Sequence, residues 1–208
     1  VLNPKEVVFE GGRELELDAV SEVPRYYVCN AYGVCGIYSA PGTAVKEAYD
    51  TSGIVTNDRG VTVWLKGNRV SRNQIMAIKE ESVTEQKNSL AVCLDNILRH
   101  AGITRNTEYD LAQGKTATTI LSENMTGVQV LDLSGCTLDA VLYYVNQDIP
   151  VLAILEDGEA VLVTGFNEFN VVIMEPATGK LYKKGMNDAT AWFAENGNHF
   201  ITYMRIEN

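Results

Sequence analysis

The hydrophobic and polar positions divide the chain into two parts with different patterns. In the first part, the Tyr- and Val-rich runs 25–32 and 34–38 predict two strands, and the runs 53–56 and 61–65 around turn residues 57–60 predict a hairpin. Between these pairs, apolar residues at helical spacing after Ser39, the expected N-cap, predict one helix that ends at Gly53. We therefore expect a small sheet with one helix, whose core contains Trp64 and the tyrosines.

The second part follows a polar segment, 79–88, which lacks apolar periodicity and is typical of a linker. Apolar residues at i, i+3, i+4, i+7 and i+8 then predict a helix over 89–100, which Gly102 stops. Further helices are expected over 109–111, 116–123 and 138–147. Consecutive antiparallel strands are expected over 150–155, 160–166 and 170–174. A short helix over 190–194 and a last strand over 200–206 complete the pattern. The pattern predicts an α+β protein with two domains, 1–80 and 81–208.

Composition and charge exclude several classes of protein. The chain has 208 residues, 46% of them hydrophobic, and 17 Lys and Arg against 27 Asp and Glu give a formal net charge of −10. This charge repels phosphate backbones and anionic lipid, so we expect no nucleic-acid partner and no membrane contact. No run approaches the roughly 20 apolar residues of a membrane span. The sequence starts at Val1 without an initiator Met, so targeting signals are expected to lie outside it.

The cysteines and histidines do not suggest a metal site. The four cysteines match no paired Cys-x-x-Cys pattern, and the chain has only two histidines, so we expect neither zinc nor another cofactor. Cys29 and Cys35 flank a turn centred on Tyr32 and Gly33. Two readings remain open: small apolar residues in neighbouring strands, which we favour, or one local disulfide in an oxidising compartment.

Three segments of the second part resemble a known family. Residues 88–102, with the Cys93-Leu94 step and the ending Leu98-Arg99-x-x-Gly102, resemble the catalytic helix of the bacterial double-glycine (bacteriocin-processing) cysteine peptidases and their C39-like relatives. Residues 157–166 resemble the family's Gly-His-x-Val-x-Val-x-Gly-Tyr strand, and 172–179 its Asp-Pro-x-x-Gly turn. The resemblance covers about residues 89–206 in the right order, and it implies a papain-like fold for the second domain, in which helices precede an antiparallel sheet.

The resemblance also assigns the catalytic positions, and these carry other residues here. Alignment on Gly102 and Gly165 places the family's nucleophilic Cys at Ser89, its base His at Glu159 and its orienting Asp at Glu175. The family's oxyanion-hole Gln falls near Val83, and the nearest glutamine is Gln86.

This set of residues is poorly suited to peptidase chemistry. A papain-type thiolate is stabilised by an imidazolium partner and by the helix N-terminus, whereas a hydroxyl needs a stronger base than a thiol does. A carboxylate is a weak proton acceptor at neutral pH. His100 lies near the far end of the same predicted helix, and His199 lies beside the last strand.

Each candidate residue also has a purely structural interpretation. Ser89 is in the right place for a helix N-cap, which we favour over a catalytic hydroxyl. Glu159 and Glu175 fit ordinary turn positions, which we also favour. Cys93 is expected to be a buried core thiol, because His100, seven residues later on the helix, is about 10 Å away along the axis.

We therefore expect the second domain to be a degenerate papain-like peptidase, a pseudopeptidase without enzymatic activity that binds a peptide or protein segment in its cleft. Relatives with such domains imply a bacterial protein in the cell envelope or outside the cell. One alternative is an active hydrolase with an unusual centre, built on Ser89 with Glu159 and Glu175 or on Cys93. The other is a cell-wall or surface interaction module in which the cleft has no function.

Overall fold

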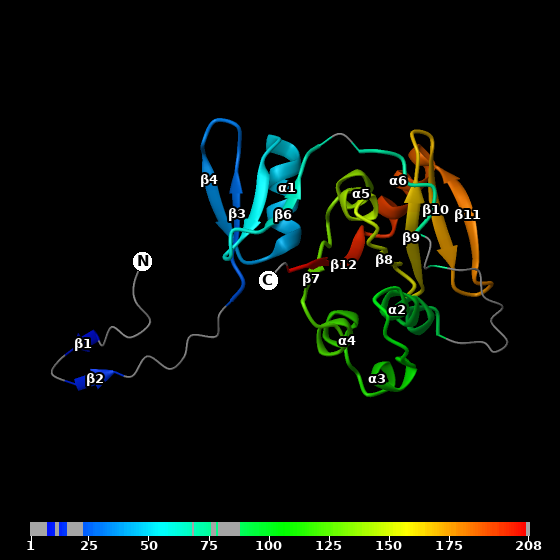
Figure 1. Cartoon of the computed structure of the whole chain (residues 1–208), viewed down its shortest axis with the longest axis horizontal. Coiled ribbons are helices and arrows are strands. Elements are labelled where there is room, and N and C mark those ends of the chain that lie inside the picture. Colours follow the sequence, from blue (N-terminus) through cyan, green and yellow to red (C-terminus); the bar gives the residue numbers. More distant parts are fainter. Residues whose placement is uncertain are drawn as a thin grey trace.

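The computed structural model describes residues 8–10, 13–15, 23–67, 69–75, 78 and 88–206 (Figure 1). The predicted linker lies outside the described residues except for Asn88, and so do Val83 and Gln86. At the start of the chain, β1 (Val8–Glu10) and β2 (Arg13–Leu15) pair as a short antiparallel hairpin that the sequence pattern did not predict.

The first unit is an antiparallel sheet with one helix, as predicted. It contains β3 (Tyr26–Cys29), β4 (Cys35–Tyr38), α1 (Pro41–Thr51), β5 (Ile54–Asn57) and β6 (Thr62–Leu65), and the strand order is β4-β3-β5-β6. Trp64 and Tyr26 are buried as predicted, but the prediction was wrong for Tyr32, which is 91% exposed, and Tyr27, Tyr38 and Tyr49 are only partly buried. The expected Ser39 cap was wrong: the N-cap residue is Ala40, which makes no side-chain capping bond, and Pro41 begins the helix, where its fixed φ fits the first turn.

The second unit places helices before a six-stranded antiparallel sheet. Its elements are α2 (Ser89–His100), α3 (Glu108–Ala112), α4 (Ala117–Asn124), β7 (Val128–Asp132), α5 (Leu138–Asn146), β8 (Val151–Ile154), β9 (Ala160–Phe166), β10 (Asn170–Glu175), β11 (Lys180–Gly185), α6 (Met186–Glu195) and β12 (His199–Arg205). The strand order is β11-β10-β9-β8-β12-β7. The observed α2 and β9 have the bounds that the sequence predicted. Helix α6 is longer than expected, and β7 and β11 were not predicted.

β9 lies near the middle of the larger sheet and is buried along its whole length. Because successive residues of a strand point to opposite faces and every residue of β9 is buried, both of its faces are covered, and helices α2 and α5 both pack on this strand. A strand covered on two faces is a continuous apolar run rather than an alternating one, which explains the sequence 160–166. Because α2 packs on β9, the N-terminus of the helix is held beside the start of the strand.

The two units share one buried core. The indole Nε1 of Trp64 in β6 donates to the carbonyl of Ala140 in α5 (3.0 Å), and the hydroxyl of Tyr144 donates to the carbonyl of Val63 (3.1 Å). Gly42 in α1 approaches the loop after β7 so closely that a Cβ at Gly42 would lie 2.9 Å from the Ser134 carbonyl oxygen. The predicted boundary near residue 80 stays a prediction, but the two units are packed together rather than joined only by a linker.

A segment between the units, 69–75, also attaches to the second unit. The amide of Phe166 donates to the Arg72 carbonyl (2.6 Å), and the amide of Ile75 donates to the Thr164 carbonyl (2.8 Å), so the segment runs along the end of β9. Arg69 forms an ion pair with Asp139 at the start of α5. Segment 69–75 is therefore part of the second unit's framework.

Cys29 and Cys35 form a disulfide, which corrects the interpretation we favoured from the sequence. The β3–β4 register places the two residues directly opposite each other, with Cα atoms 4.2 Å apart. Directly opposite cysteines on neighbouring strands are within bonding distance. The sequence spacing alone did not reveal this register.

No helix in the described part of the chain is long and apolar enough to cross a membrane.

Candidate functional site

The N-terminus of α2 is the position at which the family resemblance places a nucleophile. Asn88 caps the helix: its side-chain oxygen accepts hydrogen bonds from the amides of Leu90 (2.9 Å) and Ala91 (3.3 Å). Our expectation that Ser89 is the cap was therefore wrong. Asn and Ser are both good capping residues, and Asn88, one position earlier, takes the role.

The Ser89 side chain faces β9. Its Oγ accepts a hydrogen bond from the amide of Ala160, the first residue of β9, at 3.0 Å. Ala160 is buried, so this bond satisfies an amide that water does not reach. The structure thus brings Ser89 next to the residue that follows Glu159, and the hydroxyl joins the start of the helix to the start of the strand.

Glu159 belongs to the turn between β8 and β9 and its side chain is exposed. Its amide donates to the Asp157 carboxylate (3.0 Å) and its carbonyl accepts from the amide of Leu155 (2.7 Å), around Gly158 with a positive φ of 85°. The Glu159 charge contributes to the raised pKa of the Cys93 thiol, second to burial. The carboxylate is therefore within electrostatic reach of α2, while its backbone has an ordinary turn role.

Glu175 lies at the end of β10, at the same end of the sheet as the start of β9. Its exposed carboxylate accepts a hydrogen bond from the Thr178 hydroxyl (2.8 Å), and its carbonyl accepts from the amide of Gly179 (2.8 Å). These bonds close the turn into β11. The carboxylate is thus directed to its own turn, which is the structural role we favoured from the sequence.

Cys93 is fully buried on the inner face of α2. Burial raises the pKa of its thiol well above the ordinary value, and the charge of Glu159 adds to the effect. The other free cysteine, Cys136, is also buried, and burial raises its pKa to about 12. A nucleophilic cysteine needs a lowered pKa and access to substrate, so both thiols have the opposite properties.

The two histidines lie away from Ser89. The Nε2 atom of His100 is 2.6 Å from the Asp148 carbonyl oxygen, at the other end of α2. His199 begins β12, and its register partner on β8, Ile154, is in turn the partner of Ala160. Two strand spacings separate the backbones of His199 and Ala160, or about 10 Å. The sequence contains no further histidine that could act as the base.

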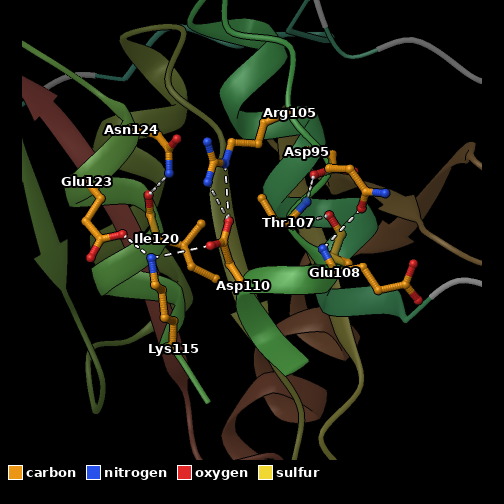
Figure 2. A network of polar contacts seen from close by, with 11 residues as sticks. Asp95, Arg105, Thr107, Glu108, Asp110, Lys115, Ile120, Glu123 and Asn124 are labelled. Atoms are coloured by element: carbon orange, nitrogen blue, oxygen red, sulfur yellow. Dashed lines mark hydrogen bonds and ion pairs between the residues drawn. The ribbon is translucent and has the colours of Figure 1, made fainter. Parts of the chain in front are cut away.

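A polar network that the sequence did not reveal holds α2, α3 and α4 together (Figure 2). The nearly buried carboxylate of Asp110 lies between the Arg105 guanidinium (3.0 Å) and the Lys115 ammonium (3.3 Å), and Lys115 also contacts Glu123 (2.5 Å). Hydrogen bonds from Arg105 hold the pKa of Asp110 below its ordinary value; desolvation opposes this shift and Lys115 reinforces it. Arg105, Asp110, Lys115 and Glu123 each have an oppositely charged partner, so we assign these four side chains a structural role.

The described residues contain no group of three or more His, Cys, Asp or Glu side chains that could hold a metal ion. Two surface cavities lie beside the C-terminal end of α5. One, of about 670 Å³, is lined by residues 70–74 and Asn146, and the other, of about 490 Å³, lies between β6, the end of α5 and β12. Neither is lined by Ser89, Glu159 or Glu175.

No protein-family model and no curated protein sequence matches the chain. A solved structure from Bacillus anthracis, described as a C39-like peptidase, aligns with a TM-score of 0.54 at 14% identity and covers 68% of this chain and 100% of its own. The chain therefore contains a C39-like fold, and the predicted papain-like α+β architecture is confirmed. A double-glycine motif protease from an AMS/PCAT transporter, solved in complex with a leader peptide, aligns at 16% identity with a TM-score of 0.40 and covers 67% of this chain and 97% of its own.

Proposed function

We propose that the C39-like unit is a pseudopeptidase that binds a peptide or protein segment without cleaving it. One observation carries the proposal: the hydroxyl at the nucleophile position, Ser89, accepts a hydrogen bond from the backbone amide of Ala160, and no imidazole lies beside it. The fold is peptidase-like, but a fold does not transfer an activity, so the argument rests on the residues at this position.

The chemistry of the position supports a loss of catalysis. A serine nucleophile must give its proton to a base while it attacks the carbonyl carbon. The candidate base at the family's histidine position, Glu159, is exposed and therefore solvated, and a solvated carboxylate is too weak an acceptor for a hydroxyl proton. Glu175 is engaged by Thr178 and does not supply the missing base.

Incubation of the purified chain with a mixed peptide library, followed by mass spectrometry, tests the loss of catalysis. We expect no new peptide termini above those of a protein-free control. Cleavage that disappears in Ser89→Ala would disprove the proposal, because it would show that the hydroxyl acts as a nucleophile in this setting.

Binding is tested with the same library on an array probed with the labelled chain. We expect a subset of peptides to bind, and Glu159→Arg to change that subset because the substitution reverses a charge beside α2. Glu168→Arg is the matched control, since Glu168 is exposed in the turn at the opposite end of β9. Equal effects of the two substitutions, or no binding at all, would contradict a binding role at this end of the sheet.

The alternative that uses Cys93 is tested with a thiol probe at neutral pH. Because burial raises the pKa of Cys93 and Cys136, we expect neither thiol to be labelled in the folded protein and both to be labelled after unfolding in denaturant. Rapid labelling of Cys93 alone in the folded protein would instead support an active thiol.

We further propose that the protein works outside the bacterial cytoplasm, as a module of the cell envelope or of the extracellular space. The Cys29–Cys35 disulfide supports this location, since disulfides persist in oxidising compartments and are rare in the cytosol. Thiol counting on protein isolated from its native cells tests it: we expect two free thiols, and four would contradict this location.

A further inference from the structure

The disulfide of the first unit lies on the exposed face of its sheet. Helix α1 packs on the other face (Figure 1), where the register pair Val28 and Val55 is buried. Successive residues of a strand point to opposite faces, so Cys29 and its two register partners, Cys35 on β4 and Ile54 on β5, point away from α1. All three are exposed. A reagent in solution can therefore reach this bond.

The β3–β4 hairpin has other contacts that hold it besides the disulfide. The Asn30 side chain accepts hydrogen bonds from the amides of Tyr32 (3.0 Å) and Val34 (3.1 Å), and the Asn30 amide donates to the Val34 carbonyl (3.0 Å). Strand β3 also pairs with β5 along its whole length. The disulfide joins residues only six positions apart, and short loops gain the least stability from a cross-link. We therefore expect the hairpin to stay folded when the bond is broken.

The sheet order indicates which sulfur a thiol can attack. In thiol–disulfide exchange a thiolate attacks one sulfur and the other leaves, and the attack comes from the side opposite the leaving sulfur. β4 is the edge strand, so Cys35 has no neighbouring strand on the side opposite Cys29. For Cys29 the corresponding side faces Ile54. Cys35 is therefore open to attack, and Cys29 is the leaving group.

Charge and polarity around the disulfide select among thiols. Glu47 on α1 is exposed and lines a cavity of about 130 Å³ together with Cys35 and Gly36, and the whole chain has a net charge of −10. Both repel a thiol that carries further negative charge. On the disulfide's own face, Ile37 and Ile54 are 65% and 48% exposed. Exposed apolar side chains favour contact with an apolar segment.

We propose that the Cys29–Cys35 disulfide is a thiol–disulfide exchange site for cysteine thiols flanked by apolar, uncharged residues. The partner's thiolate attacks the Cys35 Sγ, the bond to Cys29 breaks, and the Cys29 thiolate takes a proton from water. A second thiol of the partner then attacks the mixed disulfide and releases Cys35 as a thiol. The chain's disulfide thus gains two electrons and two protons, and the partner dithiol is oxidised to a disulfide.

Reduction of the folded chain by a dithiol tests the first part of the proposal. The chain is incubated with dithiothreitol without denaturant, its free thiols are alkylated, and the modified residues are identified by mass spectrometry. We expect alkylation at Cys29 and Cys35 with an unchanged circular dichroism spectrum. Cys93 and Cys136 are buried and serve as internal controls that should stay unmodified. Reduction only in denaturant, or alkylation of all four cysteines together, would overturn the proposal.

Two single-cysteine peptides, with either leucine or glutamate on both sides of the cysteine, test the site of attack and the selectivity. Mixed disulfides are quenched in acid and located by mass spectrometry, and each rate is divided by that of the same peptide with a small neutral disulfide. We expect the adduct on Cys35 and a normalised rate at least about fivefold higher for the leucine peptide. An adduct mainly on Cys29, or equal normalised rates, would contradict the proposal.

Glu47→Gln and Glu168→Gln are matched variants for the selectivity. Both side chains are exposed and both substitutions remove one negative charge, but Glu168 lies in the turn between β9 and β10. We expect Glu47→Gln alone to raise the normalised rate of the glutamate peptide. Equal effects of the two variants would overturn the assignment of Glu47 as a selecting charge. The site belongs to the first unit, so these results are independent of the function proposed for the second.

Discussion

Ser89 makes its hydrogen bond to a neighbouring strand instead of to its own helix. Asn88 satisfies the first free amides of α2, which leaves the Ser89 hydroxyl to accept from the buried amide of Ala160. The same side chain that the family resemblance places at the nucleophile position therefore connects two elements. This role depends on a residue 71 positions away in the sequence, and local capping rules could not reveal it.

Ser89→Ala should lower the free energy of unfolding by about 1–3 kcal/mol, because it leaves the buried Ala160 amide without an acceptor. Urea unfolding followed by circular dichroism measures the change. Ser122→Ala is the control, since Ser122 is exposed on α4 and the substitution should change stability by less than about 0.5 kcal/mol. A similar, small effect of both substitutions would show that water replaces the Ser89 hydroxyl.

Helices α2, α3 and α4 are held together by polar contacts as well as by apolar packing. Asp95 in α2 accepts the amide of Thr107, and the Thr107 hydroxyl donates to the Ala91 carbonyl, so the start of α3 is bonded to α2 (Figure 2). Asp110 in α3 bonds to Arg105 before it and to Lys115 before α4. A five-residue helix is too short to be stable in isolation, so α3 depends on these contacts.

Asp110→Asn should lower the melting temperature at neutral pH, with a difference that disappears in acid. The pKa of Asp110 is lowered in the folded protein, so its stabilising effect is present above the unfolded-state pKa of about 3.9 and is lost as the pH falls through the folded-state pKa. Melting temperatures of both proteins at a series of pH values measure this. Glu108→Gln, an exposed change on the same helix, is the control and should show no such trend. A constant difference down to acid pH would contradict the ionic origin.

We expect the two units to unfold as one cooperative structure, because they share a buried core. Trp64 belongs to the first unit but donates its indole hydrogen to α5, and Tyr144 of α5 donates to β6. The ion pairs of Arg69 with Asp139 and of Arg72 with Asp148 attach the intervening segment to both ends of α5. Such contacts couple the stability of neighbouring units.

The two tryptophans report on this coupling, since Trp64 lies in the first unit and Trp192 in the second. In Trp192→Phe, we expect the fluorescence of Trp64 and the far-ultraviolet circular dichroism to give the same denaturant midpoint. In Trp64→Phe, the midpoint reported by Trp192 should fall by the equivalent of at least about 1 kcal/mol, although the substitution is in the other unit. Two separate midpoints, or an unchanged Trp192 transition, would mean that the domains unfold independently.

Elements with a strong apolar pattern were predictable, and weakly patterned edge strands were not. The helix over 89–100 and the strand over 160–166 have the bounds that periodicity indicated, because both bury a continuous set of side chains. β11, with three lysines and no buried residue, resembles a loop in sequence, and β7 has mixed burial. These strands exist because a neighbouring strand provides hydrogen bonds, which the local pattern does not encode.

The sequence determined the apolar periodicity, the order of the strongly patterned helices and strands, the excess of negative charge and the absence of a histidine at the expected base position, since these are properties of composition and local spacing. Only the tertiary structure decided that Asn88 rather than Ser89 caps α2, that Ser89 bonds to Ala160, that Cys29 and Cys35 are joined, and that Asp110 lies between two cations. The Asn88 cap is a local contact, and the other three depend on register or on packing between segments. A hydrogen bond or disulfide requires atoms within a few ångströms, and the sequence pattern predicts elements more reliably than their relative positions.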